Sequence, residues 1–278
     1  MTDHAALLAR FGRLVSGAEP IDMASAALLV AAAEYPGLDP TLQLGNLDAL
    51  AAGAARFIGD DRDPLFCANT LSQYLFDEIG LRGNRDDYYD PENSYLNRVL
   101  ERRLGIPISL SLVYVEAGKR LGIPLEGIGM PGHFLVRHTG VSDLFIDPFH
   151  GGILLSPAEC AARLEEVTGY TGPWQPDFLA PISDRDFLAR MLRNLKGIYL
   201  QQRAHEKALN TMDFLVALLP DIGVERRDRG LVHYQLGDHA AALTDLRAYQ
   251  NAEPAASSDG LIQELIEALD AQTDAGAG

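Results

Sequence analysis

The last third of this chain repeats itself. Residues 193–220 and 227–254 align when one segment is shifted by 34 positions. The matching positions are a small-apolar pair and a closing proline: Ala208-Leu209 with Ala242-Leu243, and Pro220 with Pro254. A period of about 34 residues, with a small residue at a helix crossing and a proline after the second helix, is typical of helix-turn-helix units that stack on one another. We therefore predict an all-helical domain over residues 185–278.

The repeated units resemble tetratricopeptide (TPR) repeats. Tyr199 lies at an aromatic position of the first helix, and Gly230 lies at the glycine position of the second unit. The second unit departs from the pattern, because His233 stands where an aromatic residue is usual. Each hairpin needs neighbours to bury its faces, so we expect the helix near 260–269 to cap the stack. An ordinary four-helix extension is the alternative interpretation.

The preceding part of the chain, residues 1–175, predicts a domain of mixed structure, α+β in class. Residues 3–82 have helical patterns, and a polar loop follows at 83–90. Residues 108–121 are apolar on most sides, which predicts the buried central helix of the domain. Residues 169–184 are rich in glycine and proline, and we interpret them as a linker.

The polar loop ends in a signal for the start of a helix. Asp90 is placed to cap a helix, and Pro91 would occupy the first helical position, where its missing N–H costs nothing. We predict that this helix runs to about Leu104 and ends at Gly105.

Three short strand-like runs follow the central helix, at 125–130, 134–137 and 144–146. A hairpin centred on Gly140 would place His133 directly opposite Asp147, with Cβ atoms about 5 Å apart. A carboxylate in that position can accept a hydrogen bond from an imidazole nitrogen, fix the tautomer of the ring and stabilise its charged form. The pair therefore forms a candidate His–Asp half of a catalytic triad, and a structural cross-strand pair is the alternative.

A metal site is a further possibility at this hairpin. His138 and His150 lie close in sequence, with Asp143 or Asp147 as a carboxylate ligand. The spacing matches no standard zinc pattern. We therefore predict no metal and no cofactor.

A triad also needs a nucleophile, and the N-terminus of a buried helix is a favoured place for one. The helix after Gly105 begins without a cysteine, and Ser109 and Ser111 carry the hydroxyls of its first turns. Ser109 is the candidate nucleophile, and a capping hydroxyl is the alternative reading. Both cysteines, Cys67 and Cys160, lie on other segments and are interpreted as small buried apolar side chains.

Several motifs together resemble a known family. They are Gly83-Asn84, Tyr88-Tyr89-Asp90-Pro91-Glu92-Asn93-Ser94-Tyr95-Leu96, Gly105-Ile106-Pro107-Ile108-Ser109-Leu110, Pro131-Gly132-His133-Phe134-Leu135-Val136-Arg137 and Ile146-Asp147-Pro148-Phe149. This combination, over about residues 40–255, resembles the bacterial SirB-type family, in which a transglutaminase-like core of the papain type is joined to a C-terminal TPR segment.

The resemblance implies a helical lobe packed on a small antiparallel sheet, followed by TPR-like hairpins. It also implies that His133 and Asp147 correspond to the transglutaminase histidine and aspartate. The family's cysteine has no counterpart, because its usual position falls near Pro107, two residues before Ser109. A serine is a much weaker nucleophile than a cysteine, since its hydroxyl is scarcely ionised near neutral pH.

Charge and composition limit the choice of partners. The chain has 39 acidic and 23 basic residues and a net charge of −16, which disfavours nucleic acid and anionic lipid as partners. We find no apolar segment long enough for a membrane span and no secretory signal. The two cysteines do not indicate a disulfide framework. We therefore expect a cytoplasmic protein.

Two functions from different classes remain open. In the first, the chain is a non-catalytic scaffold or regulator that binds an unknown protein or peptide partner through its degenerate core and its TPR-like helices. In the second, it is a hydrolase or acyl transferase that acts on amide or ester bonds with Ser109, His133 and Asp147. The missing cysteine favours the first, because the residues of a site decide its chemistry, whereas the fold does not. Whether the chain is an enzyme stays undecided by its sequence.

Overall fold

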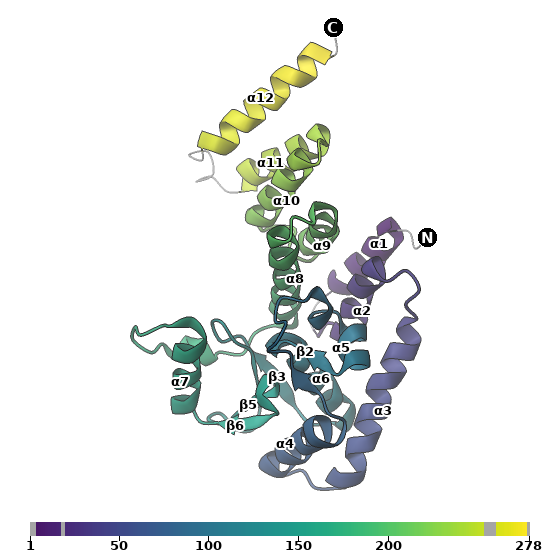
Figure 1. Cartoon of the computed structure of the whole chain (residues 1–278), viewed down its shortest axis with the longest axis vertical. Coiled ribbons are helices and arrows are strands. Elements are labelled where there is room, and N and C mark those ends of the chain that lie inside the picture. The colour runs from purple at the N-terminus through teal and green to yellow at the C-terminus, as the bar shows by residue number, and fades with distance from the viewer. Residues whose placement is uncertain (1–3, 18–19, 253–259, 277–278) are drawn as a thin grey trace. The chain divides into compact units, whose positions relative to one another are not determined.

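The computed structural model of the chain describes residues 4–17, 20–252 and 260–276. It contains helices and a four-stranded antiparallel sheet, and the helices dominate (Figure 1). The class is therefore α+β, as the sequence predicts. None of the helices in these ranges is long and apolar enough to cross a membrane.

The chain divides into two compact units. The first is formed by Gly17–Met191, and the second by Leu192 onward together with helix α1 (His4–Val15). Grouping α1 with the C-terminal helices was not expected from sequence. The domain ranges 1–175 and 185–278 remain a prediction, because a compact unit and a domain need not share a boundary.

The first unit contains most of the chain's helical segments. They are α2 (Met23–Glu34), α3 (Pro40–Ile58), α4 (Pro64–Ser72), the π-helix η1 (Gln73–Glu78), the 3-10 helix η2 (Pro91–Asn93), α5 (Leu96–Arg102), α6 (Pro107–Leu121), the 3-10 helix η3 (Pro148–His150), α7 (Pro157–Thr168) and the 3-10 helix η4 (Pro176–Leu179). Capping residues set several of their starts: Asp39 and Asp63 accept from backbone N–H groups of α3 and α4, and Ser156 and Glu159 form a capping box on α7.

Helix α6 is the buried centre of the first unit, as predicted. Its residues from Pro107 to Gly118 are all buried. Helices α3 and α5 and strands β3 (Leu125–Ile128) and β4 (Leu135–His138) contact it (Figure 1). Gly122 ends the helix in the left-handed conformation, which a glycine adopts without strain.

The sheet has the strand order β3-β4-β5-β6, where β5 is Phe145–Asp147 and β6 is Ile153–Leu155. Strands β4 and β5 pair Val136 with Ile146 and Arg137 with Phe145. The predicted register, centred on Gly140, was therefore wrong by two residues, and β6 was not predicted. A two-residue strand pair, β1 (Arg82–Gly83) with β2 (Leu104–Gly105), lies apart from this sheet.

The helix predicted to run from Asp90 to Leu104 is broken in the structure. Asp90 caps as expected, because its side chain accepts from the N–H of Glu92. The helix stops after η2, however, because Tyr95 takes an extended conformation (ψ 121°) and packs edge-on against Tyr35 with ring centroids 5.4 Å apart. A separate helix, α5, then begins at Leu96.

Residues 169–184 are not a free linker. Tyr170, Trp174 and Phe178 pack against the apolar cluster behind the sheet, which includes Ile128 and Cys160. Their burial explains why a glycine- and proline-rich segment stays attached to the core.

The second unit is all helical in the part that the structure describes. It comprises α1, the end of α8 (Asp184–Gln201), α9 (His205–Leu218), α10 (Gly223–Gln235), α11 (His239–Ala252) and α12 (Gly260–Gly276). The small residues of the repeat, Ala208 and Ala242, are fully buried. Helix α12 packs on α11 through an apolar cluster, as expected for a capping helix. The second repeat's proline, Pro254, lies outside the described residues.

Candidate active site

The turn that carries His133 precedes strand β4. The backbone N–H of His133 donates to the carbonyl of Met130, and Gly132 has a positive φ of 71°. Arg190 holds this turn from helix α8, because its Nη2 donates to the carbonyl of Met130 at 2.6 Å and to that of His133 at 2.8 Å. Burial lowers the pKa of Arg190, and the nearby Tyr88 acts in the opposite direction.

The structure brings His133 and Asp147 together. His133 Nε2 lies 3.0 Å from Asp147 Oδ1, and the two residues are 3% and 0% exposed. The contact expected from the sequence is therefore present, although His133 lies in a turn and not in a strand. A carboxylate can only accept, so Nε2 carries the proton and Nδ1 of the neutral ring keeps a lone pair. That Nδ1 makes no hydrogen bond with any residue in the described part of the chain.

A second histidine shares the same carboxylate. His150 Nδ1 lies 2.7 Å from Asp147 Oδ2, and the backbone N–H of His150 donates to Asp147 Oδ1 at 3.3 Å. Arg163 Nη1 lies 3.2 Å from the other ring nitrogen of His150, Nε2. A guanidinium has only donors, so Nε2 of His150 must accept and Nδ1 must carry the proton. Arg163 thereby fixes the tautomer in which His150 donates to Asp147.

This network controls the charge of Asp147. Burial by itself would raise the pKa of the carboxyl group, but the hydrogen bonds that His133 and His150 donate to it outweigh this effect. The pKa of Asp147 is therefore well below its ordinary value. The carboxylate stays ionised and orients both rings.

His133, Asp147 and His150 also form a possible metal-binding cluster, since one ligand atom from each lies within 4.8 Å of the others. A metal at His150 Nδ1 would require the ring proton to move to Nε2, where it would face the N–H of Arg163. The contacts therefore fit a hydrogen-bonded network better than a metal site. His138 lies outside the cluster, because its Nδ1 accepts from the N–H of Gly140 and closes the hairpin turn.

Ser109 is not in contact with His133. Its Oγ donates to the carbonyl of Asn93 at 2.6 Å and accepts from the N–H of Ile106 at 3.0 Å, and the residue is fully buried. Among the described residues, its hydrogen bonds stay within the loop and the start of α6. The hydroxyl thus caps the helix and ties it to the loop, and the second hydroxyl, that of Ser111, is buried without a partner.

The loop that Ser109 holds is organised by two buried asparagines. Asn84 Nδ2 donates to Asn93 Oδ1 at 3.0 Å, and Asn93 Nδ2 donates to the carbonyl of Asp87 at 2.7 Å. Tyr88 of this loop lies edge-on to Phe149, with ring centroids 6.0 Å apart, and Phe149 lies edge-on to His133 at 6.2 Å. Arg85 lies over the Phe149 ring at 5.9 Å.

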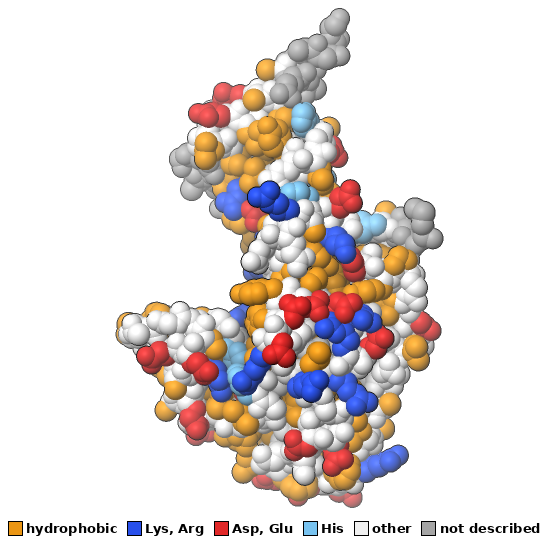
Figure 2. Space-filling model, in the orientation of Figure 1, with side chains coloured by type: hydrophobic (Ala, Val, Ile, Leu, Met, Phe, Trp, Pro, Cys, Tyr) orange, Lys and Arg blue, Asp and Glu red, His pale blue; other side chains and the backbone are white. Residues whose placement is uncertain are grey.

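The acidic loop and the His133 network therefore share an aromatic wall, Tyr88 and Phe149. Figure 2 shows histidine atoms beside Lys or Arg atoms in a hollow next to the α7 segment. Sequence reasoning missed the roles of Arg163, Arg190 and Asn93. Asn93 lies within one of the motifs that carry the family resemblance. The sequence around the two arginines does not indicate what they bind.

Neither cysteine has the surroundings of a nucleophile. Burial, followed by the charge of Asp147, raises the pKa of the Cys160 thiol to about 12. Burial and the nearby Asp61 also raise the pKa of Cys67. Both side chains are buried, and neither forms a disulfide.

We therefore expect iodoacetamide at pH 8 to leave Cys160 unmodified in the native chain. A pKa of about 12 in place of 9.0 leaves about a thousandfold less thiolate. Mass spectrometry of tryptic peptides measures the labelling, and the urea-unfolded chain, with both cysteines modified, is the positive control. Rapid labelling of native Cys160 would show that its thiol is accessible and ionised.

Comparison with known proteins identifies this core. Residues 43–193, more than half of the chain, match the transglutaminase-like superfamily. The chain belongs to the transglutaminase-like superfamily. Residues 195–267 match the tetratricopeptide repeat family, so TPR-like helices follow the transglutaminase-like core.

Several curated proteins resemble this transglutaminase-like chain over part or most of its length. A UPF0162 protein of Xylella fastidiosa (strain Temecula1) is 39% identical over 88% of this chain and 89% of its own length. A UPF0162 protein of Vibrio cholerae is 30% identical over 75% of this chain and 78% of its own length. Human F-box only protein 21 is 30% identical over 55% of this chain but only 25% of its own length. No solved structure matches the chain.

Proposed function

We propose that this transglutaminase-like chain is a non-catalytic scaffold or regulator that binds a protein partner in the cytoplasm. The observation that supports this most is the position of Ser109. At the helix start where the resemblance places a cysteine, the nearest hydroxyl is fully buried and bonded to the carbonyl of Asn93. In the described part of the chain, no hydroxyl or thiol is hydrogen-bonded to His133, which supports a non-catalytic role.

The helical unit that follows the core supports a binding role. TPR-type repeats present extended surfaces to other proteins. Exposed apolar side chains of α10 and its flanking turns could contribute to such a surface: Ile222, Val224, Tyr234 and Leu236. The match to human F-box only protein 21 covers a quarter of that protein, so a related segment also occurs joined to other sequences.

The first test is enzymatic. We expect the purified full-length chain to show no transglutaminase or protease turnover above a protein-free blank, with an amine donor and casein as acceptor. His133→Ala should leave this result unchanged, because a base without a nucleophile does not start acyl transfer. Turnover lost in Ser109→Ala would instead establish the hydrolase alternative. Turnover lost on alkylation or in Cys160→Ala would establish a thiol enzyme.

The second part of the test concerns binding. A partner identified by affinity capture should bind the wild-type chain again when both are purified. Tyr234→Ala, on an exposed position of α10, should weaken this binding, and Leu42→Ala, an exposed apolar position of α3, serves as the matched control. Equal binding by both variants would place the partner elsewhere on the chain.

A further inference from the structure

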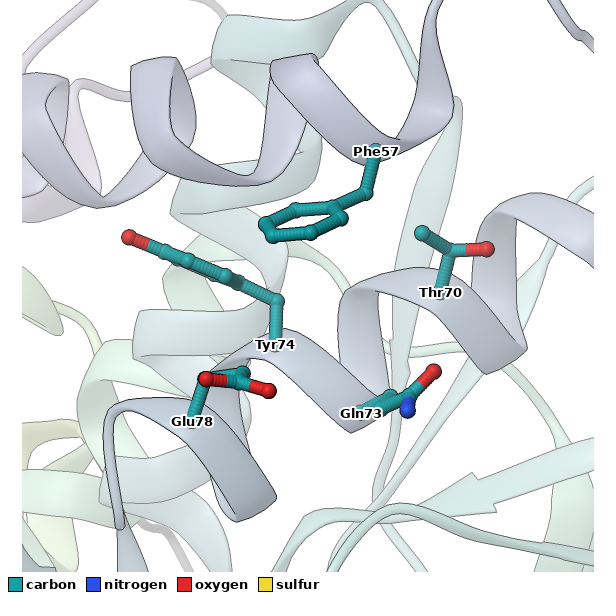
Figure 3. A pocket seen from close by; sticks show the side chains of 5 residues that line it. All are labelled: Phe57, Thr70, Gln73, Tyr74 and Glu78. Carbon is teal, nitrogen blue, oxygen red and sulfur yellow. The ribbon is translucent and has the colours of Figure 1, made fainter.

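A small hollow lies between the end of α3 and the continuous helix formed by α4 and η1. It is lined by Phe57, Thr70, Gln73, Tyr74 and Glu78, and its volume, including the part open to solvent, is about 260 Å³ (Figure 3). The enclosed part of this space is far smaller than a pocket for a drug-sized ligand, so the hollow takes no more than a single side chain of a partner.

Two aromatic rings form its wall. Phe57 reaches from α3 toward the ring of Tyr74, and the ring centroids are 5.8 Å apart (Figure 3). Phe57 is 57% exposed, so most of its ring is available to a partner. Tyr74 packs closely against Gly53, and this packing holds its ring in place. A Cβ atom added at Gly53 would lie 1.8 Å from the Tyr74 hydroxyl oxygen. Tyr74 also lies in a π-helix, a distortion that is frequent at functional sites.

The hollow has one acidic group, Glu78, beside the neutral polar residues Thr70 and Gln73. Glu78 lines the hollow, and neither it nor the neighbouring Asp77 forms an ion pair with a residue in the described ranges. Asp60, in the turn after α3, is likewise exposed. Arg62 Nη1 donates to the carbonyls of Gly59 and Asp61, and among the described residues Arg62 forms no ion pair with Glu78.

We propose that this hollow binds an arginine side chain from a basic segment of a partner protein. A guanidinium is planar and cationic, so it can stack on the Phe57 or Tyr74 ring while it pairs with the carboxylate of Glu78. An apolar side chain would instead desolvate Glu78 without compensation. The net charge of −16 would attract a basic segment from solution. The inference goes beyond the proposed function, and it uses none of the residues of the His133 network.

The test uses N-acetyl-arginine amide as the probe and the neutral N-acetyl-citrulline amide as its isosteric control. Backbone amide shifts of the ¹⁵N-labelled full-length chain are followed during titration at low salt. We expect saturable shifts near Phe57 and along residues 70–78 with the arginine probe and not with the citrulline probe. Glu78→Gln and Phe57→Ala should each weaken binding roughly three- to fivefold.

Asp143→Asn is the matched control, because it removes one exposed carboxylate outside the hollow and should leave binding unchanged. Equal shifts with the citrulline probe would show that the hollow does not select for positive charge. Equal affinity of the Glu78→Gln and Asp143→Asn variants, or displacement of the probe by N-acetyl-leucine amide, would also overturn the proposal. None of these measurements depends on activity or on a captured partner, so failure here leaves the scaffold proposal standing.

Discussion

Replacing Asp147 by Asn is expected to lower the free energy of unfolding by about 1.5–3 kcal/mol, the usual contribution of hydrogen bonds to a charged group. The carboxylate is fully buried and accepts from the rings of both His133 and His150. An amide of the same shape carries no charge and offers only one accepting atom, so one of the two rings must change its tautomer or lose its hydrogen bond. Urea unfolding at pH 7, followed by circular dichroism, measures the loss.

The loss should depend on pH with a definite sign. The pKa of Asp147 in the folded chain lies below the ordinary carboxyl value of 3.8. The stabilisation by the carboxylate is therefore fully present above about pH 4 and disappears as the pH falls through the folded pKa. The difference between wild type and Asp147→Asn should shrink below pH 4.

A matched control for this variant is Asp143→Asn, which changes an exposed carboxylate of the same hairpin. It should alter the free energy of unfolding by less than about 0.5 kcal/mol. A loss below about 1 kcal/mol for Asp147→Asn would mean that the two histidines do not depend on this charge.

Replacing Arg229 by Met is expected to lower the stability of the second unit by about 3 kcal/mol. Arg229 Nε and Nη2 bind both oxygens of Asp245 at 2.6 and 2.7 Å, and Nη1 binds Asp213 at 2.9 Å. Asp245 is only 2% exposed, so removal of its bidentate partner leaves a buried charge. Arg226 lies 3.7 Å from Asp245 and compensates part of its charge. The expected loss of stability is therefore at the low end of the range for a broken buried ion pair.

Arg247→Met is the matched control, because it removes an ion pair with Asp270 in which both side chains are exposed. Such pairs contribute about 0–1 kcal/mol. Urea unfolding of both variants, compared with the wild type, separates the two cases. Equal losses would show that the Arg229 network is no stronger than a surface pair.

Local sequence signals predicted the helices well. Asp90 and Pro91 predicted a helix start, and the apolar segment 108–121 predicted a buried helix; the structure contains both. These signals work because capping is decided within one turn of the chain. The break between η2 and α5 was missed because Tyr95 leaves the helix to pack against Tyr35, which is remote in sequence.

The candidate site was predicted only in part for the same reason. His133 and Asp147 are in contact as expected, even though the register of the hairpin was wrong. Turn geometry at Met130–His133 compensates for that error, because it directs the ring to the end of β5. Arg163 and Arg190 come from helices α7 and α8, and nothing near them in the sequence shows what they bind.

The bond from Ser109 to the carbonyl of Asn93 limits how this chain could acquire thiol chemistry. Asn93 also bonds to Asn84 and to the carbonyl of Asp87, so the Ser109 contact ties the centre of this loop to the start of α6. In Ser109→Cys, a larger sulfur atom and a weaker donor would take a site with no spare room. A nucleophile gained there by one substitution would loosen the loop whose Tyr88 lies against Phe149.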